Sequence, residues 1–177
     1  MNVAYDPQSW QSFYVTVGGA AAALTGLLFV AMSLHSKAIM ADPLHSSRAL
    51  GTLLSLITQL FIAGAVLIPG QSSTWLGIEV EAAAIFAVVQ TIRTVARTLR
   101  SPQRHGRSRL RTVLEGIGGG IWIVLFVASG ISLMVHAGGG LYLLAGVMPF
   151  MFGWNIYIAW TLITEVSESE SERRGRP

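Results

Sequence analysis

The chain contains no cysteine and little charge. Of its 177 residues, 12% are charged, about half of the roughly 25% found in soluble domains. The absence of cysteine excludes disulfides, thiolate metal sites, iron–sulfur clusters and cysteine nucleophiles. Because 52% of the residues are hydrophobic, this composition is typical of an integral membrane protein.

Signals for catalysis and for cofactors are also missing. The sequence has no HExxH or GxSxG motif and no paired acidic clusters that would hold Mg²⁺ over a phosphate. Of its histidines, His35, His45 and His105 fall at or beyond one expected membrane surface, and His136 falls at the other. No two share a depth at which they could ligate a haem. We therefore expect a protein that is not an enzyme and holds no cofactor or metal.

Five long apolar runs are present instead. Each has about 20 residues, the length that a helix needs to cross ~30 Å of hydrocarbon. They predict an all-α integral membrane protein with a single helical bundle over residues 1–166 and a disordered, charged tail over residues 167–177. The expected spans are residues 13–34, 48–69, 75–97, 113–136 and 141–163.

The basic residues predict the orientation of this bundle. With five spans, all 12 lysines and arginines fall on or next to one side of the membrane. The positive-inside rule makes that side cytoplasmic, so the N-terminus is expected outside and the C-terminus in the cytoplasm. In the alternative, residues 75–97 do not cross; four spans remain, and Lys37 and Arg48 move outside.

The same bias indicates the expected location and partners. Lys37 is the single lysine among the basic residues, and an excess of arginine is typical of GC-rich bacterial genomes. We expect a multi-pass protein of the bacterial inner membrane that contacts the lipid bilayer. Because the arginines follow the topology, we expect no binding to nucleic acid.

The third apolar run carries charge at both ends of its apolar core. Two glutamates precede the core and two arginines follow it: Glu79, Glu81, Arg93 and Arg97. Glu81 and Arg93 are 12 residues apart, about 18 Å along a helix, which is less than the ~30 Å of hydrocarbon. Arginine can snorkel to the surface, whereas glutamate is too short. We therefore expect this helix inside the bundle or at a subunit interface.

These glutamates suggest a pore mouth. In a homo-oligomer, Glu79 or Glu81 would form a carboxylate ring that attracts cations. The two point about 200° apart on a helix, so only one can face an axis. The alternative is a helix start at the membrane interface, anchored by Trp75 and stabilised by the helix dipole.

Polar residues at depth add further candidates. Gln59, Gln90 and Asn155 lie within the apolar runs, where amides need partners. They either line a polar pathway or form interhelical hydrogen bonds. At the cytoplasmic ends, Glu115 and Glu165 are expected to pair with the two arginines of the third run as an ion-pair clamp.

Small residues recur at a spacing of four on two helices. The first run carries Gly18, Ala22 and Gly26, and the fourth carries Gly116 and Gly120. This spacing lets two helices approach closely, within one chain or between chains.

Two functions fit these features. The first is a small homo-oligomeric channel or transport protein, with an ion pathway near the third helix and an acidic outer mouth. The alternative is a non-catalytic accessory or scaffold subunit that binds a partner protein through its glycine stripes, its arginine-rich loop or its tail.

Overall fold

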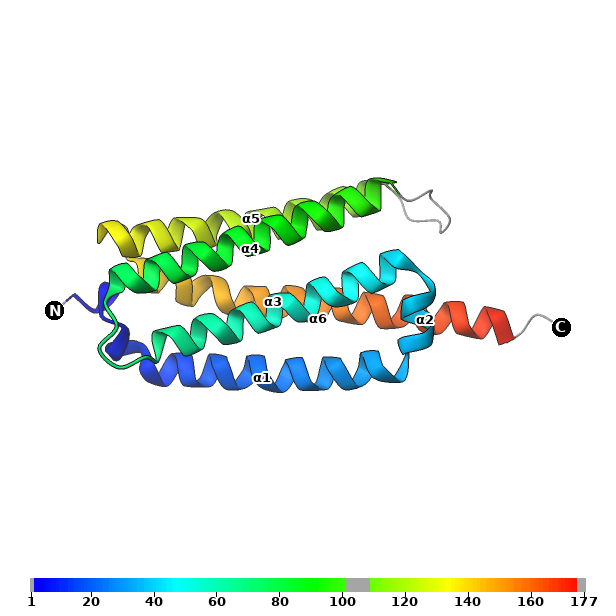
Figure 1. Ribbon diagram of the computed structural model, residues 1–177, viewed down its shortest axis with the longest axis horizontal. Coiled ribbons are helices and arrows are strands. Elements are labelled where there is room, and N and C mark those ends of the chain that lie inside the picture. The colour runs from blue at the N-terminus through cyan, green and yellow to red at the C-terminus, as the bar shows by residue number, and fades with distance from the viewer. Residues whose placement is uncertain (1, 101–108, 175–177) are drawn as a thin grey trace.

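The computed structural model describes residues 2–100 and 109–174, with side chains except at positions 44, 97–100, 109–117 and 168–174. This part of the chain is 90% helix and has no strand. Five long helices alternate in direction, so the chain termini lie at opposite ends of an elongated bundle (Figure 1). The long helices are α1 Gln11–Leu34, α3 Pro43–Val66, α4 Ser73–Arg100, α5 Arg109–Val135 and α6 Gly140–Arg174; the short ones are Val3–Tyr5, Pro7–Trp10 and α2 Ser36–Ala41.

All five long helices are long and apolar enough to cross a membrane. Their candidate spans are Pro7–Leu34, His45–Val66, Ser73–Ala96, Gly118–Val135 and Gly140–Ser167. Large apolar side chains such as Phe29, Val124 and Phe150 are more than 60% exposed, as expected for surfaces that face lipid. The prediction of an all-α chain with five helices long and apolar enough to cross a membrane is confirmed, and these helices fit a multi-pass membrane protein.

Local sequence explains where the helices end. Residues 67–72 contain Pro69 and Gly70, and Gly70 has a φ of +72°, so the chain turns after α3. The turn between α5 and α6 contains three residues with positive φ, namely His136, Gly138 and Gly139. Glycine adopts this backbone conformation without steric cost.

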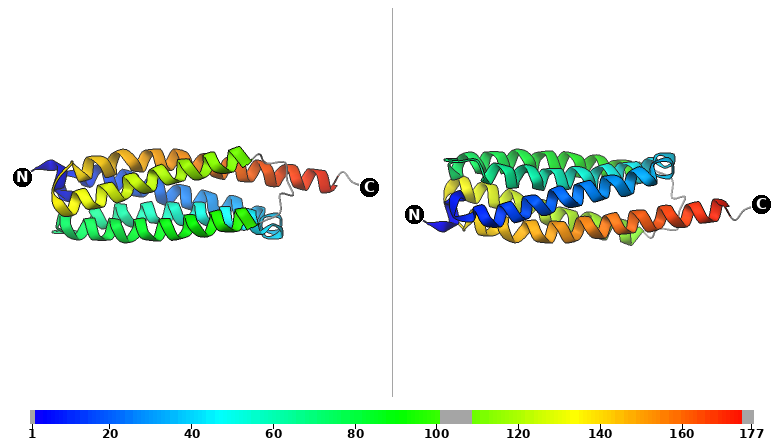
Figure 2. Two further views of the ribbon diagram at one scale, coloured as in Figure 1. Left: turned by 90° about the horizontal axis from the view of Figure 1, so that it is seen from above. Right: turned by 90° about the horizontal axis from the view of Figure 1, so that it is seen from below.

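The helices pack around two apolar clusters. We call the end of the bundle that carries residues 2–10 the N-terminal end, and the opposite end the α2 end. The N-terminal half contains the larger cluster, which includes Tyr14, Ile62, Leu76, Leu133 and Met148. The α2 half contains a second cluster, formed around Leu28, Met32, Leu56, Leu162 and Val166. Figure 2 shows α3 and α6 running along both halves.

Close helix contacts occur at glycines. A Cβ at Gly18 would lie 3.2 Å from Ala63 Cβ, so this glycine allows α1 to approach α3. The other members of the predicted stripe, Ala22 and Gly26, are exposed. At Gly120 a Cβ would meet nothing within 4 Å, and Gly116 lies outside the described side chains.

The tail differs from the expectation. Residues from 167 onward were expected to be disordered, but α6 continues as a helix to Arg174. The physical reason is that no proline or glycine interrupts the sequence between Gly153 and Gly175, and glutamate and arginine are good helix formers.

Candidate functional site: polar residues between α3 and α6

Four polar residues of α3 share one helix face. Their spacing of four, three and four residues places them in a row along the helix, and three residues of α6 are their partners or lie at the same interface. We call this set the polar column. It consists of Arg48, Thr52, Ser55 and Gln59 of α3 with Asn155, Thr161 and Glu165 of α6.

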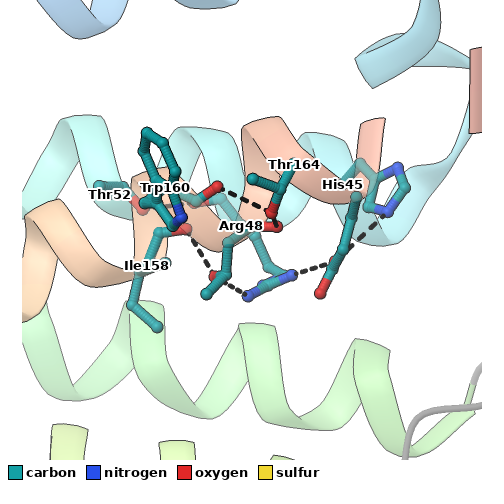
Figure 3. Close-up of polar contacts among 8 residues, drawn as sticks. His45, Arg48, Thr52, Ile158, Trp160 and Thr164 are labelled. Carbon is teal, nitrogen blue, oxygen red and sulfur yellow. Dashed lines mark hydrogen bonds and ion pairs between the residues drawn. The ribbon is translucent and has the colours of Figure 1, made fainter. Parts of the chain in front are cut away.

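An ion pair closes the column at the α2 end. Arg48 Nη1 donates to Glu165 Oε2 at 2.9 Å, and Arg48 Nη2 donates to Thr161 Oγ1 at 3.3 Å. The arginine side chain is 7% exposed and that of Glu165 is 26% exposed. Figure 3 shows Arg48 reaching from α3 towards α6. Such burial of a cation is tolerated only because the charge is paired and hydrogen-bonded.

Neighbouring groups complete this ion pair. His45 Nε2 lies 3.9 Å from the same Glu165 oxygen, so a protonated His45 would add a second positive partner. Thr161 accepts from Arg48 and itself donates to the carbonyl of Ile158 at 3.0 Å. Thr52 donates to the carbonyl of Arg48 at 3.0 Å. The arrangement links side chains and backbone of both helices into one network.

The middle of the column is a direct contact between the helices. Asn155 Nδ2 donates to Ser55 Oγ at 3.0 Å. Asn155 is buried, and this bond supplies part of the hydrogen bonding that a buried amide requires.

Gln59 is the last polar residue of the column. Its side chain is 0% exposed, and neither Oε1 nor Nε2 has a hydrogen-bond partner. Leaving a buried polar group unsatisfied costs about 1–3 kcal/mol. An amide in this state is expected to bind a polar guest such as water.

Beyond Gln59 the interface becomes apolar. The next buried residues of α3 are Ile62, Ala63, Ala65 and Val66. Leu144 and Met148 of α6 belong to the same larger apolar cluster. The polar column therefore occupies the α2 half of the bundle, and apolar side chains close the N-terminal half.

The glutamates of α4 lie at the N-terminal end and face different neighbours. Glu79 Oε2 accepts from Gln71 Nε2 at 2.6 Å. Glu81 packs against Gly130 of α5, and its Oε1 is buried without a hydrogen-bond partner. The two carboxyl groups thus diverge, as their helical spacing implies.

The three deep amides occupy two regions. Asn155 bonds across from α6 to Ser55 of α3, and Gln59 lies one turn further along the same face of α3. Gln90 of α4 accepts from Arg93 Nη1 at 3.5 Å on its own helix.

The expected clamp lies partly outside the described side chains. Arg97 and Glu115 are among the undescribed side chains, and Glu165 forms an ion pair with Arg48. Sequence analysis had missed this pair, although Arg48 begins the second run and Glu165 ends the fifth on the same expected side. That shared depth is the signal that could have found it.

A second polar group joins the N-terminal segment and the start of α4 to the turn between α5 and α6. Ser73 Oγ lies 2.6 Å from His136 Nε2, and the backbone N–H of Gly139 donates to the Tyr5 hydroxyl at 2.7 Å. Tyr5 and His136 have ring centroids 5.5 Å apart.

Within the described residues, no group of three or more His, Asp or Glu side chains could hold a metal ion.

No protein-family model, curated protein or solved structure matches this chain. Function is therefore inferred from the residues of the chain itself.

Proposed function

We propose that the protein is a small membrane transport protein, a channel or carrier for a small ion or polar solute, and that the polar column is its pathway. The observation that carries this proposal is Gln59, whose amide is fully buried and has no hydrogen-bond partner. An amide that served only to join helices would be expected to bond across the interface, as Asn155 does with Ser55. An unsatisfied amide next to that pair is suited to form hydrogen bonds with a polar solute or a hydrated ion during transport.

The asymmetry of the interface supports transport by gating. Water and ions can be stabilised as far as Gln59 from the α2 end. The apolar cluster around Ile62 and Met148 would then be the barrier, since hydrophobic constrictions block ions by excluding water. Passage requires α3 and α6 to separate at this cluster.

The ion pair at the α2 end would be the second barrier. Arg48 and Glu165 neutralise each other, and Arg48 fills the entrance to the column. Opening requires that Glu165 exchange Arg48 for another positive partner, and His45 lies 3.9 Å away. The proposal therefore assigns the inner gate to this triad.

Two parts of the earlier expectation remain within the proposal. Glu79 is partly exposed and could attract cations to the N-terminal end, as an acidic mouth would. Assembly as a homo-oligomer also remains a prediction.

The alternative function, a non-catalytic scaffold, is favoured by a different observation. On the outward face of α1, a Cβ at Gly19 or Gly26 would meet nothing within 4 Å, and Ala23 is exposed between them. A face of small residues suits close contact with another transmembrane helix. Native mass spectrometry of the purified protein distinguishes the cases: a complex with a different protein supports the scaffold, and a closed homo-oligomer supports a transport assembly.

The test of transport is a flux assay on reconstituted vesicles. Proton, potassium and chloride fluxes are measured for the wild type and for Gln59→Leu, which replaces the amide with an apolar side chain of similar size. We expect the variant to lose flux and to gain thermal stability, because an unsatisfied buried group has been removed.

Gln90→Leu is the matched control, since it removes an amide at membrane depth on another helix. We expect its flux to equal that of the wild type. Wild-type flux in Gln59→Leu, or the absence of any flux in the wild type, would overturn the proposal.

A further inference from the structure

Glu81 is a carboxyl group inside a candidate membrane span and away from the polar column. It lies eight residues into α4, which begins at Ser73, about 12 Å along the helix axis. Its side chain is neither fully buried nor fully exposed, so one part of it faces α5 and another part faces outward.

The contact with α5 is shaped to accept this carboxyl group. A Cβ at Gly130 would lie 2.5 Å from Glu81 Oε1 and 3.0 Å from its Cδ. Only a glycine at position 130 leaves the space that the carboxyl group occupies. One turn earlier on α4, Gly77 lies so close to α5 that its Cβ would be 2.8 Å from the Gly130 carbonyl oxygen.

The surroundings of this carboxyl group do not suit a negative charge. Oε1 is buried and has no hydrogen-bond partner. An ionised group within the bilayer costs at least ~2.5–3.5 kcal/mol on insertion scales. A carboxylate stabilised for ionisation would be expected to accept two or three donors.

Opposite charges that could stabilise an anion are also absent from the described side chains of α5, the helix that contacts Glu81. The span Gly118–Val135 of α5 contains no ionisable residue. On α4 itself the nearest ionisable residues are Glu79, which is bonded to Gln71, and Arg93, three turns further along. His136 follows the end of α5 and contacts Ser73.

We propose that Glu81 is a proton-binding site within the membrane, occupied by a proton in the resting protein and reactive towards apolar carbodiimides from the lipid side. The site stands apart from the transport path proposed above, and neither inference depends on the other. Its ligand is the proton, because no group of three or more His, Asp or Glu side chains among the described residues could hold a metal ion there.

The reaction that reports this proton is addition to dicyclohexylcarbodiimide. The carboxyl oxygen bonds to the central carbon of the reagent, and the carboxyl proton passes to one of its nitrogens. The acyl group then migrates to nitrogen, which leaves a stable N-acylurea and releases no other product. The reaction needs a protonated acid and a route through lipid, and Glu81 offers both.

The experiment labels the intact wild-type protein in membranes and locates the adduct by peptide mass spectrometry. We expect an adduct on Glu81 and none on Glu79, which is the matched control two residues away. A water-soluble carbodiimide should leave Glu81 unlabelled. Equal labelling of both glutamates, or no adduct on Glu81, would overturn the proposal.

Two further measurements test the assignment, and the first of them does not use labelling. The infrared spectrum of Glu81→Gln should lose the carbonyl stretch of a protonated acid that the wild type shows, and an unchanged band would contradict the proposal. Sodium ions at constant pH should not protect Glu81 from the reagent. Protection would assign the site to a metal cation instead.

Discussion

Arg48 is the one buried charged residue among the side chains that the structure describes. Its charge is balanced by Glu165 at 2.9 Å and its second nitrogen is bonded to Thr161. Removing one partner of such a pair is costly because the other charge is left uncompensated. The cost should be greater when the more buried charge is the one left alone.

We therefore expect Glu165→Ala to destabilise the protein by roughly 3 kcal/mol, near the lower end of the range for buried pairs. Arg48→Met should cost less, since the remaining Glu165 side chain is 26% exposed and lies near His45. The measurement is thermal unfolding in detergent. Arg93→Met removes an exposed arginine and should change stability by less than about 0.5 kcal/mol. A larger loss for Arg48→Met than for Glu165→Ala would contradict this explanation.

At the scale of helices, the antiparallel pair of α4 and α5 is held close by two glycines. A Cβ at Gly77 would approach backbone atoms of α5, at 2.8 Å from the Gly130 carbonyl oxygen and 3.1 Å from the Met134 nitrogen. A Cβ at Gly130 would instead meet the end of the Glu81 side chain, which can rotate away. A substitution by alanine should therefore be tolerated better at position 130 than at position 77.

Gly77→Ala is expected to destabilise the protein by about 1–3 kcal/mol, the usual cost of overpacking, and Gly130→Ala by less. Gly64→Ala, where a Cβ meets nothing within 4 Å, should be neutral or stabilising, because alanine favours a helix over glycine by roughly 0.5–1 kcal/mol. Unfolding in detergent ranks the three variants. If Gly77→Ala were as stable as Gly64→Ala, the close contact between α4 and α5 would be refuted.

Sequence patterns predicted the positions of the helices well, but they did not predict which helices pack against one another. The five spans follow from hydropathy, because the membrane requires about 20 apolar residues whatever the packing. The pairing of Arg48 with Glu165 depends on α3 lying beside α6. The hydropathy of a single apolar segment does not indicate which other helices it packs against. The same limit applies to Glu81, whose neighbour Gly130 is identified only by the packing of α5.

The whole molecule has polar residues distributed unequally between its two ends. The α2 end holds the ion pair and the polar column, and the N-terminal end holds the Glu79 bond and the contact between Ser73 and His136. Between them lies the larger apolar cluster. The proposed transport function relies on this distribution, because an apolar barrier blocks ions by excluding water.

The orientation of the bundle in the membrane can be tested cleanly because the chain has no cysteine. Ser9→Cys and Lys37→Cys place single thiols at exposed positions of the N-terminal end and the α2 end. With five spans and the basic residues in the cytoplasm, a membrane-impermeant maleimide should label Ser9→Cys in intact cells and Lys37→Cys only after permeabilisation. The four-span alternative predicts the reverse for both positions, since Lys37 would then lie outside. Labelling of both variants in intact cells would exclude either arrangement, because Ser9 precedes α1 and Lys37 follows it.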